Sequence, residues 1–311
     1  MPKVSVIIAV FNGERFIRSA VESVLSQTYR DFEIVVADDG STDRTGEIIR
    51  KLGHRIVYKR QTNAGPVAAR NLGVASSSGE YVAFLDHDDL WCGDKLERQV
   101  GILDRSSDVG MVCSEVDNIT EEGRPIRRKT WAQRRGIRGD LIGNFNALLR
   151  RSFPVTVPST WVIRRALLDK LGHFDPDIPF GGYGELEFCA RLAEYSLIYF
   201  VNASLVQYRV REGGITKQRE AEMYANYVLV LDKLWQRWRD QPDRRGLLLR
   251  LYGRYWFKRG REKLRAGDYD AAAKLLASAV CFRPFYLRPR LWLLGLQVRR
   301  CFARNTTRKY S

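Results

Sequence analysis

The chain has 311 residues, of which 45% are hydrophobic and 28% are charged. This composition excludes a largely disordered chain and allows one large domain with a smaller appendage. The five cysteines are odd in number and widely scattered, which excludes a disulfide framework and favours a reducing compartment. No signal-type segment precedes the first apolar run, and the longest late apolar run is too short to span a bilayer, so we expect a cytoplasmic protein.

The formal net charge is +16, and the excess lies in the later part of the chain. Residues 1–110 carry 14 Lys and Arg against 16 Asp and Glu, whereas residues 111–311 carry 38 against 20. A basic surface attracts nucleic acid, anionic lipid or an acidic substrate, and it also occurs as an ordinary solvated surface. The near-neutral first third argues against a nucleic-acid partner, because carboxylates at strand ends repel phosphate unless a metal intervenes.

Strands and helices are predicted to alternate over the first 90 residues. Continuous apolar runs predict buried strands, and apolar residues at helical spacing predict helices. We expect Asn12 to cap the first helix and Pro66 to begin the third. The alternation predicts an α/β fold with a mostly parallel sheet flanked by helices. The predicted strands are 4–10, 32–37, 56–58 and 81–85, and the later helices are 43–52 and 66–75.

The carboxyl ends of these strands carry polar and acidic side chains, and ligands bind at that edge of a parallel sheet. We expect the four ends to form one site for a ribose, a base or a metal. The ends read Phe11-Asn12-Gly13, Asp38-Asp39-Gly40, Gln61-Thr62-Asn63 and Asp86-His87-Asp88-Asp89.

Asp86 and Asp88 form a DxD element after a buried strand. Both carboxylates reach one divalent ion only if the strand has ended and the chain turns. Mg²⁺ and Mn²⁺ take such oxygen ligands and share substrate phosphates. Acidic residues at strand ends also cap helices, so the element alone is a weak signal.

Beyond residue 105 the pattern is less regular. A basic loop is predicted at 124–138, and the chain is predicted to be helical from about Glu220. The segment Gly267-Asp268-Tyr269 indicates one helical hairpin of tetratricopeptide type, and a stable array needs about three such units. We therefore expect a single hairpin. The other predicted elements are strands at 109–113 and 161–163 and helices at 165–171 and 185–195.

Taken together, these segments resemble the family 2 glycosyltransferases, which have the GT-A fold. The resemblance covers about residues 3–215. It implies a GT-A domain at 1–215, with a nucleotide-binding half at 1–110 and an acceptor half at 111–215, and leaves a helical region at 216–311 unexplained. The matching residues are Val4 to Ile8, Phe11-Asn12-Gly13, Ser26 to Tyr29, Asp38 to Asp43, Asn63-Ala64-Gly65, Ala69-Arg70-Asn71 and Gly79-Glu80-Tyr81 leading to Asp86-His87-Asp88-Asp89.

The resemblance implies a nucleotide-sugar donor, a saccharide or lipid-linked acceptor, and Mn²⁺ or Mg²⁺ as cofactor. Asp39 would accept hydrogen bonds from the base or ribose, with Asp38 and Asp86 in the same pocket. Asp88, with Asp86 beside it, would bind the metal that bridges the donor diphosphate. Arg70 would be a fixed cation for the diphosphate, or else an ordinary surface arginine. The remaining candidate donor contacts are Phe11, Asn12 and Asn63.

The family's general base comes from an acidic pair before a helix that ends in Arg-Leu-Ala. Here Gly184-Glu185 stands where Glu-Asp is usual, ahead of Arg191-Leu192-Ala193. Glu185 would take the aspartate's place, and Glu187 is the alternative base. Both would also favour a helix start beside its dipole without any catalytic role.

Two further segments resemble parts of the family's site. Tyr208-Arg209-Val210-Arg211 with Gly213-Gly214 resembles the closing segment that folds over the diphosphate. Ser159-Thr160-Trp161 stands where a sugar would contact the site, although Trp161 is also compatible with a core position.

The sequence therefore predicts an inverting glycosyltransferase in cell-surface polysaccharide or glycolipid synthesis. A UDP-sugar is favoured as the donor, because in this family pattern Asp39 accompanies uridine or thymidine. A sugar-nucleotide pyrophosphorylase is an alternative, but it would need a Gly-rich basic first loop, whereas this loop offers one glycine and an acid. A non-catalytic basic binding protein on the same fold is the other alternative.

The C-terminal segment is basic and apolar at once. Arg283 to Ser311 contains eight Lys and Arg and no acidic residue, interleaved with leucines and aromatic residues. This pattern predicts that residues 284–311 dock on an anionic membrane surface, at the inner face of the plasma membrane. Alternatively, Leu291, Leu294 and Val298 pack on the preceding hairpin.

Overall fold

A computed structural model describes residues 1–53, 56–134, 136–144, 157–178, 183–211, 220–285 and 287–296. The chain divides into two compact units, Met1–Val230 and Leu231–Ser311. The predicted Gly213-Gly214 and most of the basic tail lie outside the described residues.

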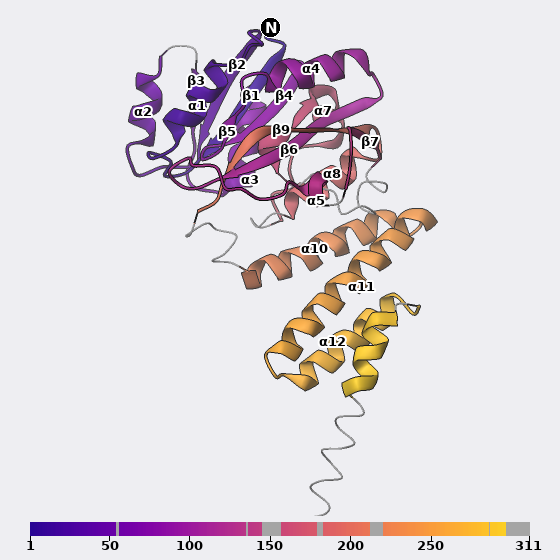
Figure 1. Cartoon of the computed structure of the whole chain (residues 1–311). Coiled ribbons are helices and arrows are strands. Elements are labelled where there is room, and N and C mark those ends of the chain that lie inside the picture. The colour runs from indigo at the N-terminus through magenta and orange to yellow at the C-terminus, as the bar shows by residue number, and fades with distance from the viewer. Residues whose placement is uncertain are drawn as a thin grey trace, which may run out of the picture. The chain divides into compact units, whose positions relative to one another are not determined.

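The first unit is built around one nine-stranded sheet, seen in Figure 1. Its strand order is β3-β2-β1-β4-β8-β6-β9-β5, and β7 also pairs with β9. The strands are β1 (Val4–Val10), β2 (Phe32–Asp38), β3 (Ile56–Arg60), β4 (Tyr81–Asp86), β5 (Leu90–Trp91), β6 (Val109–Ile119), β7 (Leu141–Gly143), β8 (Val162–Arg164) and β9 (Leu197–Arg209).

Helices connect these strands. A short 3₁₀ helix, η1 (Pro158–Thr160), precedes β8, and α10 continues from the first unit into the second. The α-helices of this part are α1 (Ile17–Leu25), α2 (Thr45–Lys51), α3 (Pro66–Ala75), α4 (Lys95–Arg105), α5 (Trp131–Arg134), α7 (Arg165–Leu171), α8 (Gly184–Leu192) and α10 (Glu220–Trp238).

The predicted α/β fold is confirmed, and the continuous parallel run of the sheet consists of β3, β2, β1 and β4. β1 pairs in parallel with β2 and β4, and β2 pairs in parallel with β3. Beyond β4 the pairing is mixed: β8 lies antiparallel between β4 and β6, whereas β9 is parallel to β6. The four parallel strands therefore end at one edge, as expected from their alternation with helices.

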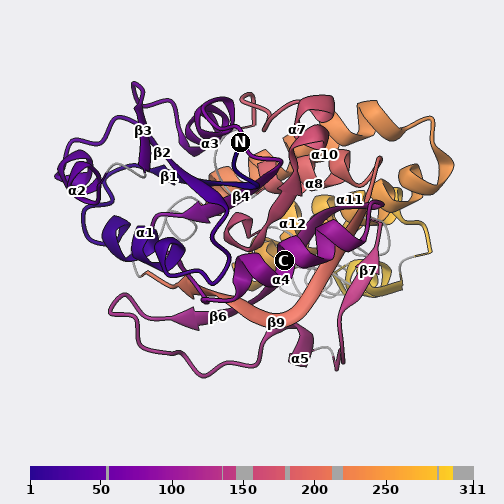
Figure 2. The same ribbon diagram turned by 90° about the horizontal axis from the view of Figure 1, so that it is seen from above.

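Successive residues of β1 face opposite sides of the sheet, one covered by α1 and α4 and the other by α3. Val4 and Val6 belong to the buried cluster that includes residues of α1 and α4. Ile7 faces the opposite layer, where α3 packs, and Figure 2 shows α3 on one side of β1 with α1 and α4 on the other. A Cβ at Gly73 would lie 2.2 Å from Cγ2 of Ile7, so the approach of α3 to the sheet requires glycine.

One local prediction is wrong, and another holds only in part. α1 begins at Ile17 with Phe16 as its N-cap residue, so Asn12 does not cap it. Asn12 has a φ of 50°, and its Oδ1 accepts a hydrogen bond from the Thr42 N–H instead (2.8 Å). The basic segment predicted as a loop at 124–138 contains the short helix α5, because Trp131 is buried against Phe200.

The second unit confirms the predicted helical hairpin. It contains α11 (Pro242–Arg265) and α12 (Tyr269–Phe282), and residues 287–296 are also helical. Asp268 caps α12 by accepting a hydrogen bond from the Ala271 N–H (3.1 Å). None of the helices in the described ranges combines the length and apolar composition that crossing a bilayer requires. The buried core of this unit includes Phe257, Ala272, Leu276, Ala279 and Leu296.

Lys95 is a fully buried lysine at the start of α4. Its Nζ donates to Gln99 Oε1 (2.6 Å) and lies 4.0 Å from the centroid of the Trp91 ring. No carboxylate in the described ranges forms an ion pair with it. Burial therefore lowers the pKa of Lys95 well below its ordinary value.

We expect Lys95→Met to raise the free energy of unfolding at neutral pH by about 1–3 kcal/mol, because it removes a buried amine that has no carboxylate partner in the described ranges. Between the lowered folded pKa and the ordinary value of 10.5, only the unfolded chain carries the extra proton, so this group makes stability rise with pH. Urea denaturation at two pH values should show a shallower pH dependence in the variant. If the free energy of unfolding depended equally on pH in both proteins, the lowered pKa of Lys95 would be contradicted. Lys51→Met, at an exposed lysine, is the control.

Candidate functional site

The ends of β1 and β2 are joined by hydrogen bonds. The Asp39 N–H donates to the Val10 carbonyl (2.8 Å), and the Asn12 N–H donates to Ser41 Oγ (3.0 Å). Phe11, at the end of β1, remains 45% exposed. An exposed aromatic ring on a fixed turn is suited to stacking against a planar ligand group.

Asp38 and Asp39 are both buried but have different partners. Asp38 accepts hydrogen bonds from the Ser41 N–H (2.8 Å) and the Tyr58 hydroxyl, so it holds the turn after β2. Burial together with Asp38 raises the pKa of Tyr58 to about 12.

Asp39 instead organises the loop that follows β3. Its Oδ1 accepts from Gln61 Nε2 (2.7 Å) and the Ala64 N–H (2.9 Å), and its Oδ2 accepts from the Gly65 N–H (2.8 Å). Asn63, within this loop, is exposed. Asp39 therefore places Asn63 at the same edge of the sheet as Phe11.

Arg70 joins three elements of the site. From α3, its Nη2 contacts Asp86 Oδ1 at the end of β4, and its Nη1 contacts Glu185 Oε1 in the first turn of α8, each at 2.9 Å. Arg70 is only 4% exposed. The structure thus brings together three predicted site residues that are separated by up to 115 positions in the sequence.

Glu187, the alternative base, has a different environment. Arg191 Nε and Nη2 bind its two carboxylate oxygens at 2.6 and 2.9 Å. Arg191 also donates to the carbonyls of Leu171 (2.7 Å) and His173 (2.9 Å). Glu187 therefore anchors the loop after α7.

The turn after β4 is held by hydrogen bonds among Asp89, Ser159 and Arg209. Asp89 accepts hydrogen bonds from Ser159 Oγ (2.6 Å) and the Arg209 N–H (2.9 Å). Burial, with Asp88 and Asp86 close by, raises the pKa of Asp89. Ser159 and Arg209 were recognisable only through the family resemblance. Trp161 is fully buried, packs against Phe174 and Phe188, and belongs to the core.

Arg209, the last residue of β9, and Arg211, two residues further on, also reach this turn. Arg209 donates from Nε to the Asp88 carbonyl (2.7 Å) and from Nη1 to the Glu121 carbonyl (2.6 Å). Arg211 Nη2 lies 2.8 Å from Asp88 Oδ2. The end of the last strand is thereby bound to the DxD turn.

The oxygens of Asp86 and Asp88 fit a hard divalent cation. Within the described ranges, no group of three or more His, Cys, Asp or Glu residues gathers around a common point. Two carboxylates are nevertheless a sufficient protein share for Mg²⁺ or Mn²⁺ when substrate phosphates complete the coordination. The set does not suit zinc, which prefers nitrogen and sulfur ligands.

The sequence is similar to known glycosyltransferases. The family model described as "Glycosyl transferase family 2" matches residues 5–172. An uncharacterized glycosyltransferase of Rickettsia typhi is 31% identical over 69% of this chain and 66% of its own length. Glycosyltransferase GlyA of Streptococcus pneumoniae is 49% identical over 28% of this chain and 13% of its own length. The chain thus spans two thirds or less of these relatives.

Solved structures show the same fold. The crystal structure of S. aureus TarS in complex with UDP-GlcNAc superposes with a TM-score of 0.66 at 20% sequence identity, covering 89% of this chain and 81% of the TarS chain. This likeness confirms the predicted GT-A-type fold. Since the family model matches more than half of the sequence, the chain belongs to glycosyl transferase family 2.

Proposed function

We propose that the protein is an inverting glycosyltransferase that moves a sugar from a UDP-sugar to an acceptor hydroxyl. The observation that supports the proposal is the contact of Arg70 with both Asp86 and Glu185, so the residues proposed as metal ligand and as base share one cation. Family membership and the UDP-GlcNAc and UDP complexes of TarS support the donor class. Release of nucleoside diphosphate on incubation with donor and acceptor sugars tests the activity.

The proposed donor site lies at the ends of β1, β2 and β3. Phe11 would stack on the uracil ring, and Asn12 and Asn63, both exposed, would offer amide groups to the nucleoside. Asp39 has one hydrogen bond on Oδ2, so this oxygen can accept another from uracil N3–H or the ribose. Asp38 would stabilise this site indirectly, because it accepts a hydrogen bond from the Ser41 N–H and so holds the turn after β2.

Asp88, with Asp86, would hold Mn²⁺ or Mg²⁺ against the donor diphosphate. When bound, such an ion stabilises the charge that develops on the leaving diphosphate. Both ends of the Arg70 guanidinium are engaged by carboxylates, so we propose that Arg70 acts on the diphosphate by positioning Asp86.

Glu185 would act as the general base. Arg70 holds its Oε1, which leaves Oε2 to take the proton of the acceptor hydroxyl. As that proton leaves, the acceptor oxygen bonds to the anomeric carbon, and the bond from that carbon to the diphosphate oxygen breaks on the opposite face. One such in-line displacement inverts the configuration at the anomeric carbon.

We expect Glu185→Gln to lower turnover by about 10²–10⁴-fold while UDP affinity stays close to that of the wild type, because only proton transfer is lost. Steady-state kinetics and calorimetry measure the two effects. Glu185→Asp, which restores a carboxylate, should retain more turnover than the glutamine variant. Wild-type turnover by Glu185→Gln would exclude this residue as the base.

Glu187→Gln should act on stability more than on turnover. It leaves the buried Arg191 without its carboxylate partner, which we expect to cost about 1–3 kcal/mol of unfolding free energy. Chemical denaturation measures this, with Glu47→Gln, in an exposed pair with Lys51, as the control that should lose less. A stable Glu187→Gln protein that has lost transfer would instead identify Glu187 as the base.

Donor binding should favour UDP over GDP and should depend on the metal. Titration calorimetry with Mn²⁺ should give the tightest binding for UDP, and EDTA or Asp88→Asn should weaken it, because the diphosphate loses its counter-charge. Tighter binding of GDP would refute the proposed base specificity. Equal UDP binding in Mn²⁺ and EDTA would refute the metal site.

We propose that the transferase domain ends near residue 215 and that residues 216–311 form a separate helical region. This region would place the enzyme at its acceptor. A lipid-linked saccharide of cell-surface polysaccharide or glycolipid synthesis is the acceptor class that suits a protein attached to the inner face of the plasma membrane.

Apolar side chains in the helix at 287–296 support such attachment. Leu287 and Leu291 are 70% and 65% exposed, and Phe285, just ahead of the helix, is 94% exposed. Leu296 instead packs in the core of the second unit. Leu291 and Leu294, which the alternative prediction packs on the hairpin, are 65% and 56% exposed, and Val298 lies outside the described residues. The exposed side of this helix is therefore available to a bilayer.

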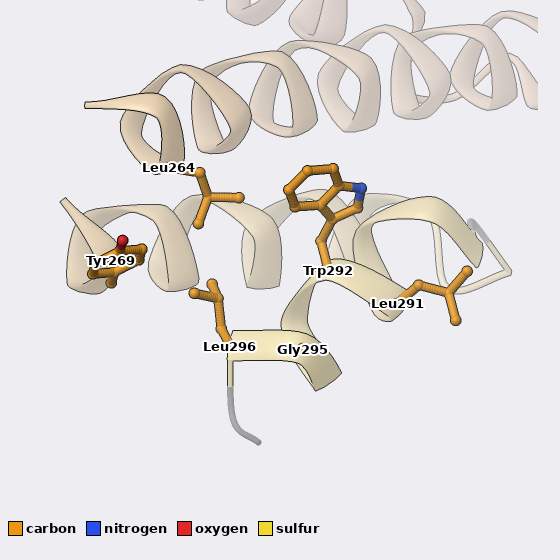
Figure 3. A pocket seen from close by; sticks show the side chains of 6 residues that line it. All are labelled: Leu264, Tyr269, Leu291, Trp292, Gly295 and Leu296. Carbon is orange, nitrogen blue, oxygen red and sulfur yellow. The ribbon is translucent and has the colours of Figure 1, made fainter. Parts of the chain in front are cut away.

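A cavity of about 340 Å³ adjoins these exposed residues. Figure 3 shows its lining from α11, α12 and the helix at 287–296. Arg261 lies over the Trp292 ring, with its Cζ 5.9 Å from the ring centroid. Arginine beside apolar and aromatic side chains is the arrangement that an anionic lipid surface attracts. The lining residues are Leu264, Tyr269, Leu291, Trp292, Gly295 and Leu296.

The full chain should sediment with vesicles that contain anionic phospholipid, and less so in high salt. Leu291→Asp should weaken this binding, because a carboxylate replaces an apolar group at the headgroup boundary and is repelled by the lipid. Ile142→Asp on β7 is the matched control, because it introduces the same charge at another exposed aliphatic residue. This variant should bind the vesicles as the wild type does. Failure of the wild type to bind, or equal binding by Leu291→Asp, would contradict membrane docking.

A further inference from the structure

Asp88, the carboxylate proposed to hold the metal, is already paired with a cation of the protein. Arg211 Nη2 lies 2.8 Å from Asp88 Oδ2, and the two side chains are 29% and 15% exposed. The Arg211 guanidinium also lies over the Phe16 ring, with its Cζ 5.8 Å from the centroid. A guanidinium therefore already contacts one of the two Asp88 oxygens that could bind a divalent ion.

Arg209 and Arg211 are held to very different degrees. Arg209 donates to main-chain carbonyls of Thr120, Glu121 and Asp88, and its own N–H is bound by Asp89, so it is a fixed part of the fold. Within the described ranges, the Arg211 side chain has Asp88 as its sole ion-pair partner. Arg211 is therefore the arginine that can leave without loosening the turn.

We propose that Arg211 is a displaceable counter-ion that competes with the divalent metal for Asp88. The inference rests on the proposed metal site. A guanidinium and a divalent cation repel each other, so an ion that binds Asp88 must displace Arg211. The freed guanidinium remains tethered two residues from the fixed Arg209, where its donors suit phosphate oxygens.

This competition couples metal binding to donor binding. Without the donor, release of Arg211 from Asp88 leaves a cation next to the incoming metal, which weakens metal affinity. With the diphosphate present, Arg211 gains an anionic partner, so metal and nucleotide should each strengthen the binding of the other by the same factor. Removing the guanidinium should remove the share of this coupling that Arg211 supplies and leave the share that comes from attraction between the metal and the diphosphate.

Mn²⁺ binding followed by electron paramagnetic resonance tests the proposal without any turnover. Arg211→Gln should bind Mn²⁺ about tenfold more tightly than the wild type in the absence of nucleotide, because one repelling charge is gone. UDP should then increase Mn²⁺ affinity less in the variant than in the wild type. Arg211→Lys, which keeps the charge, should restore the weaker Mn²⁺ binding.

Two controls separate the possible failures. Arg98→Gln removes the same charge from a remote exposed pair with Asp94 and should leave Mn²⁺ affinity unchanged. Asp88→Asn should abolish the specific Mn²⁺ signal. If Asp88→Asn loses Mn²⁺ while Arg211→Gln binds it with wild-type affinity, the competition is refuted and the metal site stands. If no variant and no wild-type protein binds Mn²⁺, the metal site and the competition both fall.

Discussion

A buried guanidinium sets the main constraint on this site. Arg70 is 4% exposed, and a charge so far from water is tolerated only when it is paired and hydrogen-bonded. Its partners, Asp86 and Glu185, belong to a central strand and to a distant helix, so α3, β4 and α8 must be in place together. The neighbouring Asn71 reinforces this arrangement by exchanging two hydrogen bonds with the main chain of Phe174.

The remaining site residues depend on main-chain geometry at the strand ends. Asp38 and Asp39 fix successive turns, and Asp89 fixes the turn that carries Asp86 and Asp88. Asp38, Asp39 and Asp89 therefore stabilise the loops of the site mainly by hydrogen bonds to main-chain N–H groups. Through these hydrogen bonds, the buried carboxylates hold the residues that would contact a ligand in a fixed position.

The early strands, α3 and the convergence of strand ends could be predicted because they depend on local patterns: apolar runs, helical spacing and a proline at a helix start. β9 was missed because its 13 residues mix buried and half-buried positions without a regular alternation, and its pairing with β6 contains register shifts. The different partners of Asp38 and Asp39 could not be predicted from adjacent, identical residues. The resemblance indicated the segment Tyr208 to Arg211, but the individual partners of Arg209 and Arg211 could not be predicted, because the second part of the chain is rich in arginine throughout.

The position of β9 affects the order in which the sheet can form while the chain is being synthesised. It is the last strand of the sheet in sequence, yet it lies between β6 and β5 and also pairs with β7. These earlier strands lack their neighbour until residues 197–209 have left the ribosome, so the sheet on that side closes late. Exposed strand edges favour wrong pairing in nascent chains, so this half of the domain is the more prone to mispairing until β9 is in place.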